Sequence, residues 1–176
     1  ALSRDLSQVP AEKNEQADEK TGLPADTADL KVKASRFVAA AYLFGARYTQ
    51  DFDIDEVPFA NDVHTLIASY VKSKALLGEK ITLSEIFDFF EEGTPEYEEL
   101  CRVLDLNDGE NLEGEVPQRY FSDCLRLLKT ESIADAIEEV KKQFSATDDV
   151  EEKRQTAELL QKLIKQKEKL KNGDIR

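Results

Sequence analysis

The strongest constraint on the fold is a helical apolar repeat that runs from Pro117 to Phe144. Its first half is apolar over a wide arc, which is typical of a helix inside a bundle. Its second half narrows to one stripe, which is typical of a helix with a single partner. At about 1.5 Å per residue the helix would be roughly 40 Å long, so we expect it to project from a small bundle. The repeat consists of Tyr120, Phe121, Cys124, Leu125, Leu127, Leu128, Ile133, Ala136, Ile137, Val140 and Phe144.

The partner of the projecting half is expected to be the last periodic stretch, which follows a turn at residues 145–147. Asp148 and Glu151 are spaced as a capping box at its start. Two antiparallel helices have little core of their own, so their outer apolar side chains stay in water unless another protein covers them. The alternative is that this hairpin folds back onto the bundle. The apolar positions of the last helix are Val150, Ala157, Leu159, Leu160, Leu163, Ile164 and Leu170.

Shorter helices are expected before the long one. Asn61 or Asp62 can cap the second of them, and Gly78 can end it. Thr82 and Glu85 are spaced as a capping box for the third. The apolar periods place these helices at residues 33–48, 61–77, 82–93 and 94–104.

These patterns predict an all-α protein, with a compact helical bundle followed by a long helix and a C-terminal antiparallel helical hairpin. The low content of glycine (7) and proline (5) fits this fold class. We expect residues 1–32 to be a disordered linker or tail, because they hold few large apolar side chains. Residues 33–130 are expected to form the bundle subdomain, and residues 131–176 the hairpin subdomain.

Charge and hydropathy exclude several classes of protein. The net charge is −13, and residues 33–130 alone hold 10 basic and 19 acidic residues, which opposes direct binding to nucleic acid. No apolar run approaches the roughly 20 residues that span a bilayer, so we expect no membrane partner. The polar N-terminus does not fit a secretory signal, so we expect a cytoplasmic protein. A start at Ala1 and the lack of methionine suggest a segment of a longer protein.

Few residues are candidates for a catalytic or metal-binding role. The two cysteines, Cys101 and Cys124, give neither a disulfide framework nor a zinc site, and both fall on apolar helical faces. The one histidine, His64, has no nucleophile motif beside it, so we expect a packing or surface residue.

The alternating acids Asp51, Asp53 and Asp55 begin like a calcium-binding loop. Glu56 and Asp62, however, stand where that loop needs Gly and Glu. We therefore expect no metal, no cofactor and no catalytic residue, which means that the chain is not an enzyme by itself.

Four segments, in their order and spacing, carry a resemblance to a known family. They are SRFVAAAYLFGARY at residues 35–48, PFANDVHTLIASYV at 58–71, RYFSDCLRLLK at 119–129 and EEKRQTAELLQKLIKQKEKLK at 151–171. Together they cover most of residues 33–172. In this respect the chain resembles the C-terminal helicase-binding domain of bacterial DNA primase.

The resemblance implies a non-catalytic domain that binds the N-terminal domains of the hexameric replicative helicase and so couples RNA primer synthesis to the replication fork. In that family the distal end of the last helix is a main docking element. In some relatives, basic residues at the start of the first bundle helix hold the acidic tail of single-stranded DNA-binding protein. Here Lys33 and Arg36 would be the equivalents, although the acidic bundle opposes that role. The implied helicase-binding residues are Leu163, Gln166, Lys167, Leu170 and Lys171.

Two alternatives remain open from the sequence. The apolar stripes of the hairpin could instead join two copies of the chain, which would make it a self-associating helical structural or interaction protein. The N-terminal domain of a replicative helicase has a related bundle fold and is the other alternative.

Overall fold

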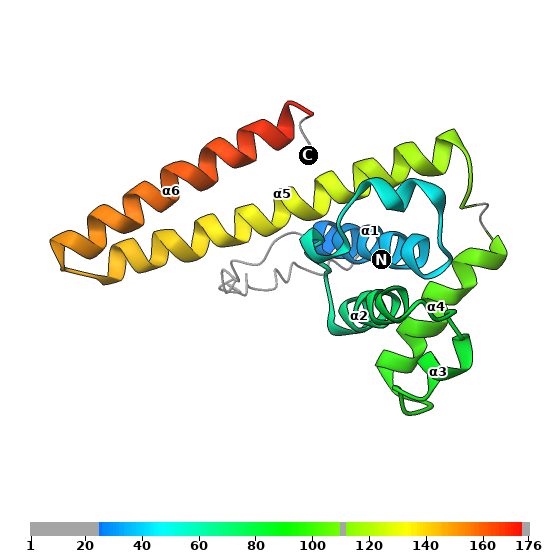
Figure 1. Cartoon of the computed structure of the whole chain (residues 1–176). Coiled ribbons are helices and arrows are strands. Elements are labelled where there is room, and N and C mark those ends of the chain that lie inside the picture. Colours follow the sequence, from blue (N-terminus) through cyan, green and yellow to red (C-terminus); the bar gives the residue numbers. More distant parts are fainter. Residues whose placement is uncertain (1–24, 110–111, 174–176) are drawn as a thin grey trace, which may run out of the picture.

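The structure is a computed structural model that describes residues 25–109 and 112–173. These residues form helices and no strand, which confirms the expected all-α fold. Figure 1 shows a bundle of short helices at one end of a long helix, and a last helix that runs back along the other half of that long helix. The elements are α1 (Ala25–Leu43), η1 (Arg47–Asp51), η2 (Ile54–Glu56), α2 (Asp62–Leu77), α3 (Leu83–Phe87), α4 (Pro95–Gly109), α5 (Glu115–Ala146) and α6 (Val150–Lys171).

α1 is the central helix of the bundle and separates two apolar cores. It packs against α2 and α4 on one side and against α5 on the other. The side chains of Ala39, Ala40 and Ala41 are fully buried. Because alanine is small, the neighbouring helices can approach the α1 backbone closely. Ala39 and Ala40 belong to the core shared with α2 and α4, whereas Ala41 belongs to the core shared with α5.

The core between α1 and α5 is built around Phe121, whose side chain is fully buried. Its ring centroid lies 5.8 Å from that of Tyr42, 5.0 Å from that of Tyr48 and 5.6 Å from that of Phe52. Such tilted and edge-to-face pairs add to the free energy that burial itself provides. These aromatic contacts explain why the first half of α5 is apolar over a wide arc.

The hydroxyl of Tyr48 is the exception in this core. It is buried, and it has no hydrogen-bond partner among the described residues. Burial, followed by the charge of Glu113, raises the pKa of Tyr48 to about 12. We expect Tyr48→Phe to raise the free energy of unfolding by about 1 kcal/mol, because it removes a buried polar atom that makes no hydrogen bond. Urea denaturation measures this change, and a clear loss of stability would mean that the hydroxyl does have a partner.

The start of α1 corrects one expectation. The helix begins at Ala25, so residues 25–32 belong to it and not to a disordered tail. Ion pairs support this first part: Lys33 Nζ lies 2.6 Å from Asp29 Oδ2, and Lys31 Nζ lies 2.9 Å from Asp135 Oδ2 on α5. The rest of the expected tail, residues 1–24, lies outside the described residues.

The helix ends agree with the expected caps at some positions and differ at others. Asn61 Oδ1 accepts a hydrogen bond from His64 N, and Gly78 ends α2 with φ of +65°, a backbone conformation that glycine adopts easily. The Thr82 side chain makes no capping hydrogen bond, so that part of the expected capping box was wrong. The cap of α6 is Asp149, which accepts from Glu152 N, one residue after the expected cap.

The hairpin of α5 and α6 is present as expected. α5 has 32 residues, about 48 Å at the rise of an α-helix, and it is continuous through residues 129–132. α6 packs along its second half, beyond the short helices (Figure 1). Among the described residues, the seam between them buries Ile133, Ile137 and Leu170, with Leu160 and Leu163 packed beside these three.

Candidate functional site

The hairpin presents apolar side chains that the described part of the chain does not cover. The exposed fraction is 45% for Leu159 and 42% for Ile164, one on each side of the seam-facing stripe of α6. At the far end of the hairpin, Phe144 is 40% exposed and Val150 is 82% exposed. Single exposed apolar residues are ordinary on a protein surface, but four on one small projecting element are typical of an interaction surface.

The five residues implied for helicase binding fall into two groups. Leu170 is buried in the seam, and Leu163 packs partly against it, so these two hold the hairpin together. Lys167 is half-buried, whereas Gln166 and Lys171 are exposed. The residues that could contact a partner without any rearrangement of the hairpin are therefore Gln166 and Lys171.

The two basic residues implied for the acidic tail of a single-stranded DNA-binding protein are both engaged within the chain. Lys33 pairs with Asp29, and Arg36 binds Glu99 through two donors on one edge of its guanidinium group, with Nε at 2.7 Å from Oε1 and Nη2 at 2.9 Å from Oε2. Binding of that tail stays a prediction. It would require Arg36 to exchange the Glu99 carboxylate for a carboxylate of the tail.

A buried polar cluster joins α1, α2 and α4. His64 and Ser35 are fully buried, and Glu99 is 7% exposed. Ser35 Oγ lies 2.8 Å from His64 Nδ1, and His64 Nε2 lies 2.9 Å from Glu99 Oε1. Arg36 completes the cluster through its two hydrogen bonds to Glu99. We refer to Ser35, Arg36, His64 and Glu99 as the junction cluster.

The acid–base properties of the junction cluster follow from burial and from these bonds. Burial lowers the pKa of His64 below its ordinary value of 6.5 and outweighs the opposite effect of Glu99. Burial raises the pKa of Glu99, but the hydrogen bonds from Arg36 and His64 outweigh it, so the pKa lies below the ordinary 4.5. Near neutral pH the cluster therefore contains a neutral imidazole and a bidentate Arg–Glu ion pair.

The order Ser35–His64–Glu99 is that of a hydrolytic triad, but the surroundings are not those of an active site. A nucleophilic hydroxyl has to reach its substrate, and the Ser35 side chain is fully buried. Its Oγ also accepts a hydrogen bond of 2.9 Å from the Ala60 backbone N–H. The arrangement is that of a structural cluster, which agrees with the interpretation of His64 as a packing residue.

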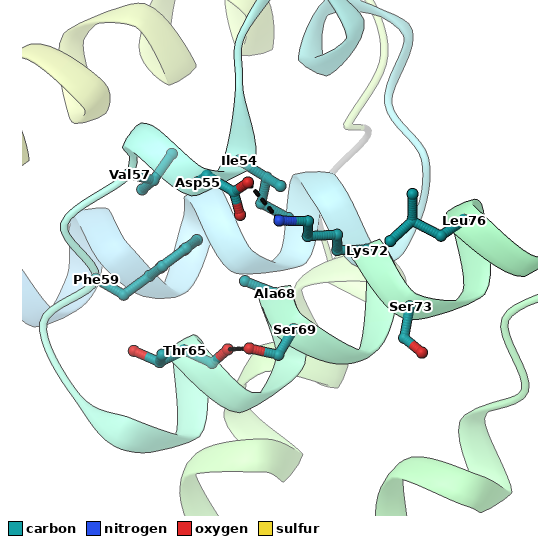
Figure 2. A pocket seen from close by; sticks show the side chains of 10 residues that line it. All are labelled: Ile54, Asp55, Val57, Phe59, Thr65, Ala68, Ser69, Lys72, Ser73 and Leu76. Atoms are coloured by element: carbon teal, nitrogen blue, oxygen red, sulfur yellow. Dashed lines mark hydrogen bonds and ion pairs between the residues drawn. The ribbon is translucent and has the colours of Figure 1, made fainter.

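An open groove, which no sequence pattern predicted, lies between α2 and the segment at residues 54–59. Its volume is about 370 Å³. Figure 2 shows Leu76 at one end, Phe59 and Thr65 toward the other, and the paired side chains of Asp55 and Lys72 between them. Leu76 is 77% exposed, so one wall of the groove stands in solvent.

For the remaining candidate residues, burial or a contact within the chain accounts for the position of the side chain. Cys124 is buried, and burial raises the pKa of its thiol to about 11, which disfavours the reactive thiolate. Asp55 is held by Lys72, and Asp53 accepts a hydrogen bond from Asp55 N. Across residues 25–109 and 112–173, no three His, Cys, Asp or Glu side chains are grouped so that they could bind a metal ion. No helix of that part of the chain is both long and apolar enough to cross a membrane.

The fold and its surfaces define a class, which is a small all-α bundle with a projecting two-helix hairpin. Comparisons with known protein families, with curated proteins and with solved structures found no match for this chain. Its function therefore has to be inferred from the sequence resemblance and from the surface of the hairpin.

Proposed function

We propose that this chain is a non-catalytic docking domain whose α5–α6 hairpin binds the N-terminal domains of a hexameric replicative DNA helicase. The partner is taken from the resemblance to the C-terminal region of bacterial DNA primase. In that role the domain couples RNA primer synthesis to the replication fork in the bacterial cytoplasm.

The observation that carries this proposal is the apolar surface of the hairpin. Phe144, Val150, Leu159 and Ile164 are all at least 40% exposed on an element that projects from the bundle. Amphipathic helices bind partner proteins by laying such side chains into an apolar groove. The α6 residues implied by the resemblance lie on this same element.

A pair of charge changes tests the hairpin as the binding element without disturbing its seam. We expect Gln166→Glu combined with Lys171→Glu to weaken binding to the helicase N-terminal domain at least about tenfold, because both side chains are exposed near the end of α6. Isothermal titration calorimetry measures the dissociation constant. The matched control is Gln50→Glu with Lys80→Glu, which makes the same charge changes at exposed bundle positions. Equal affinity of the two double variants would contradict the proposed surface.

The same exposed side chains favour a second candidate function, which is association of two copies through their hairpins. A symmetric four-helix arrangement would cover Leu159 and Ile164 of both copies. Sedimentation velocity over a range of concentrations separates the two functions. A monomer at every concentration excludes the second, and a dimer that does not bind the helicase domain excludes the first.

A further inference from the structure

The junction cluster joins three helices, and the proposed docking function does not use it. We propose that the junction cluster is an acid-sensitive latch that holds α2 and α4 onto α1. When His64 takes up a proton, α2 and α4 loosen from α1, while α1, α5 and α6 stay packed together.

The hydrogen bonds of the cluster fix the tautomer of the neutral His64 ring. The ionised Glu99 carboxylate can only accept, so His64 Nε2 carries a hydrogen and donates it to Glu99. Nδ1 of the neutral ring then carries no hydrogen and accepts from the Ser35 hydroxyl, whose Oγ accepts from the Ala60 N–H. This is the neutral ring with its hydrogen on Nε2.

A proton added to His64 disturbs this arrangement at one place. The new Nδ1–H points at Ser35 Oγ, which already accepts from the Ala60 N–H and loses the acceptor for its own hydrogen. A buried hydroxyl hydrogen without an acceptor costs free energy, and so does a charged ring that is fully buried. The folded arrangement of α1 and α2 therefore disfavours the protonated ring.

The charges around the ring do not remove this cost. From α1, Arg36 is a like charge to the protonated ring. From α4, Glu99 is an opposite charge, but it is already bound by Arg36 and by Arg102, whose Nη1 lies 3.2 Å from Oε2. Among the described residues, the groups that act on the charge of His64 are Glu99, which favours it, and Arg36, which opposes it.

The loosening is expected to be local because the fold has two cores. The cluster lies on the side of α1 that faces α2 and α4, whose apolar residues include Val63, Ile67 and Leu100. The buried residues of the core around Phe121 come from neither α2 nor α4, and only the partly buried Val71 and Leu106 of these helices pack against it. The seam of the hairpin contains no residue of α2 or α4. When the hydrogen bonds of the junction cluster are lost, these two regions keep their own buried apolar surface and are expected to stay folded.

The sign of the pH effect follows from the lowered pKa of His64 in the folded chain. An opened state takes up the proton as the pH falls through 6.5, whereas the closed state resists it. Opening therefore becomes easier below that pH, by up to about tenfold per pH unit for one proton. Glu99, with its pKa below 4.5, stays ionised in this range.

Nuclear magnetic resonance on the full chain tests the latch directly, because His64 is the one histidine of the sequence and its ring signals need no assignment. At about pH 7.5 we expect the Nε2–H tautomer. Between about pH 7.5 and about pH 5.5, we expect hydrogen-exchange protection factors in α2 and α4 to fall at least about fivefold, while those in the second half of α5 and in α6 stay constant. The matched variant His64→Gln, which cannot be protonated, should show no such fall.

Three results would overturn the proposal. One is a His64 ring that titrates at its ordinary pKa while the hydrogen-exchange protection of α2 and α4 stays unchanged. This measurement needs only the unmodified chain. Another is an equal loss of protection in α2, α4 and α6, which would mean global unfolding. The third is an unchanged pH dependence in His64→Gln.

Discussion

Replacing Glu99 with alanine is expected to lower the free energy of unfolding by about 3 kcal/mol, because it leaves Arg36 and His64 without their partner in a largely buried site. Arg36 donates two hydrogen bonds to this carboxylate, and His64 donates a third. All three bonds join α4 to α1 or α2. Urea denaturation followed by circular dichroism measures the change.

Glu98→Ala is the matched control for Glu99→Ala. Glu98 is the neighbouring residue on α4, and its side chain is 64% exposed in an ion pair with Arg102. Exposed helix pairs contribute about 0.5 kcal/mol or less, so the control should be nearly neutral. If the two variants lose the same stability, the junction cluster does not hold the three helices together.

Leu170→Asp is expected to detach α6 from α5 and to abolish binding to the helicase domain, while the bundle stays folded. Leu170 forms the buried cluster of the seam together with Ile133 and Ile137. Removing a buried leucine costs about 2–5 kcal/mol, and burying a carboxylate in its place costs more. A seam of this size is not expected to withstand such a loss.

The loss of α6 should appear as reduced helicity, with the aromatic core around Phe121 unchanged in the near-ultraviolet circular dichroism spectrum. Leu159→Asp is the matched control, because Leu159 lies on the same helix but is 45% exposed. It should keep α6 folded. If Leu170→Asp retained the helicity of the unmodified chain, the assignment of the seam would be wrong.

Much of the fold could be predicted from the sequence, because apolar periodicity reports directly on the buried face of a helix. The narrowing of the apolar arc beyond Leu128 predicted a helix with one partner, and the second half of α5 has α6 as its main partner. Asn61 and Gly78 likewise predicted where α2 begins and where it ends. These signals depend only on residues that are neighbours along the chain.

The start of α1 could not be predicted in this way. Leu30, near its start, is 55% exposed, so it adds little to a buried apolar stripe. The contact of Lys31 with Asp135 joins residues that are far apart in sequence, and a periodicity argument does not detect such pairs. Residues 25–32 therefore resembled a tail.

The junction cluster was missed for the same reason. His64, Ser35 and Glu99 come from three helices, and each has only one polar neighbour in the sequence, which does not show that the three side chains meet. Their contact depends on how α2 and α4 are placed around α1. One feature of the sequence pointed toward the cluster: Ser35 and Arg36 are polar residues within an otherwise apolar part of α1.

The most direct test of the account is a hydrogen-exchange footprint of the chain with and without the helicase N-terminal domain. We expect the added partner to slow exchange in peptides from α6 and from the end of α5 near Phe144, and to leave peptides from α2 to α4 unchanged. Slower exchange on the bundle alone, or no change anywhere at saturating partner, would contradict the hairpin as the docking element.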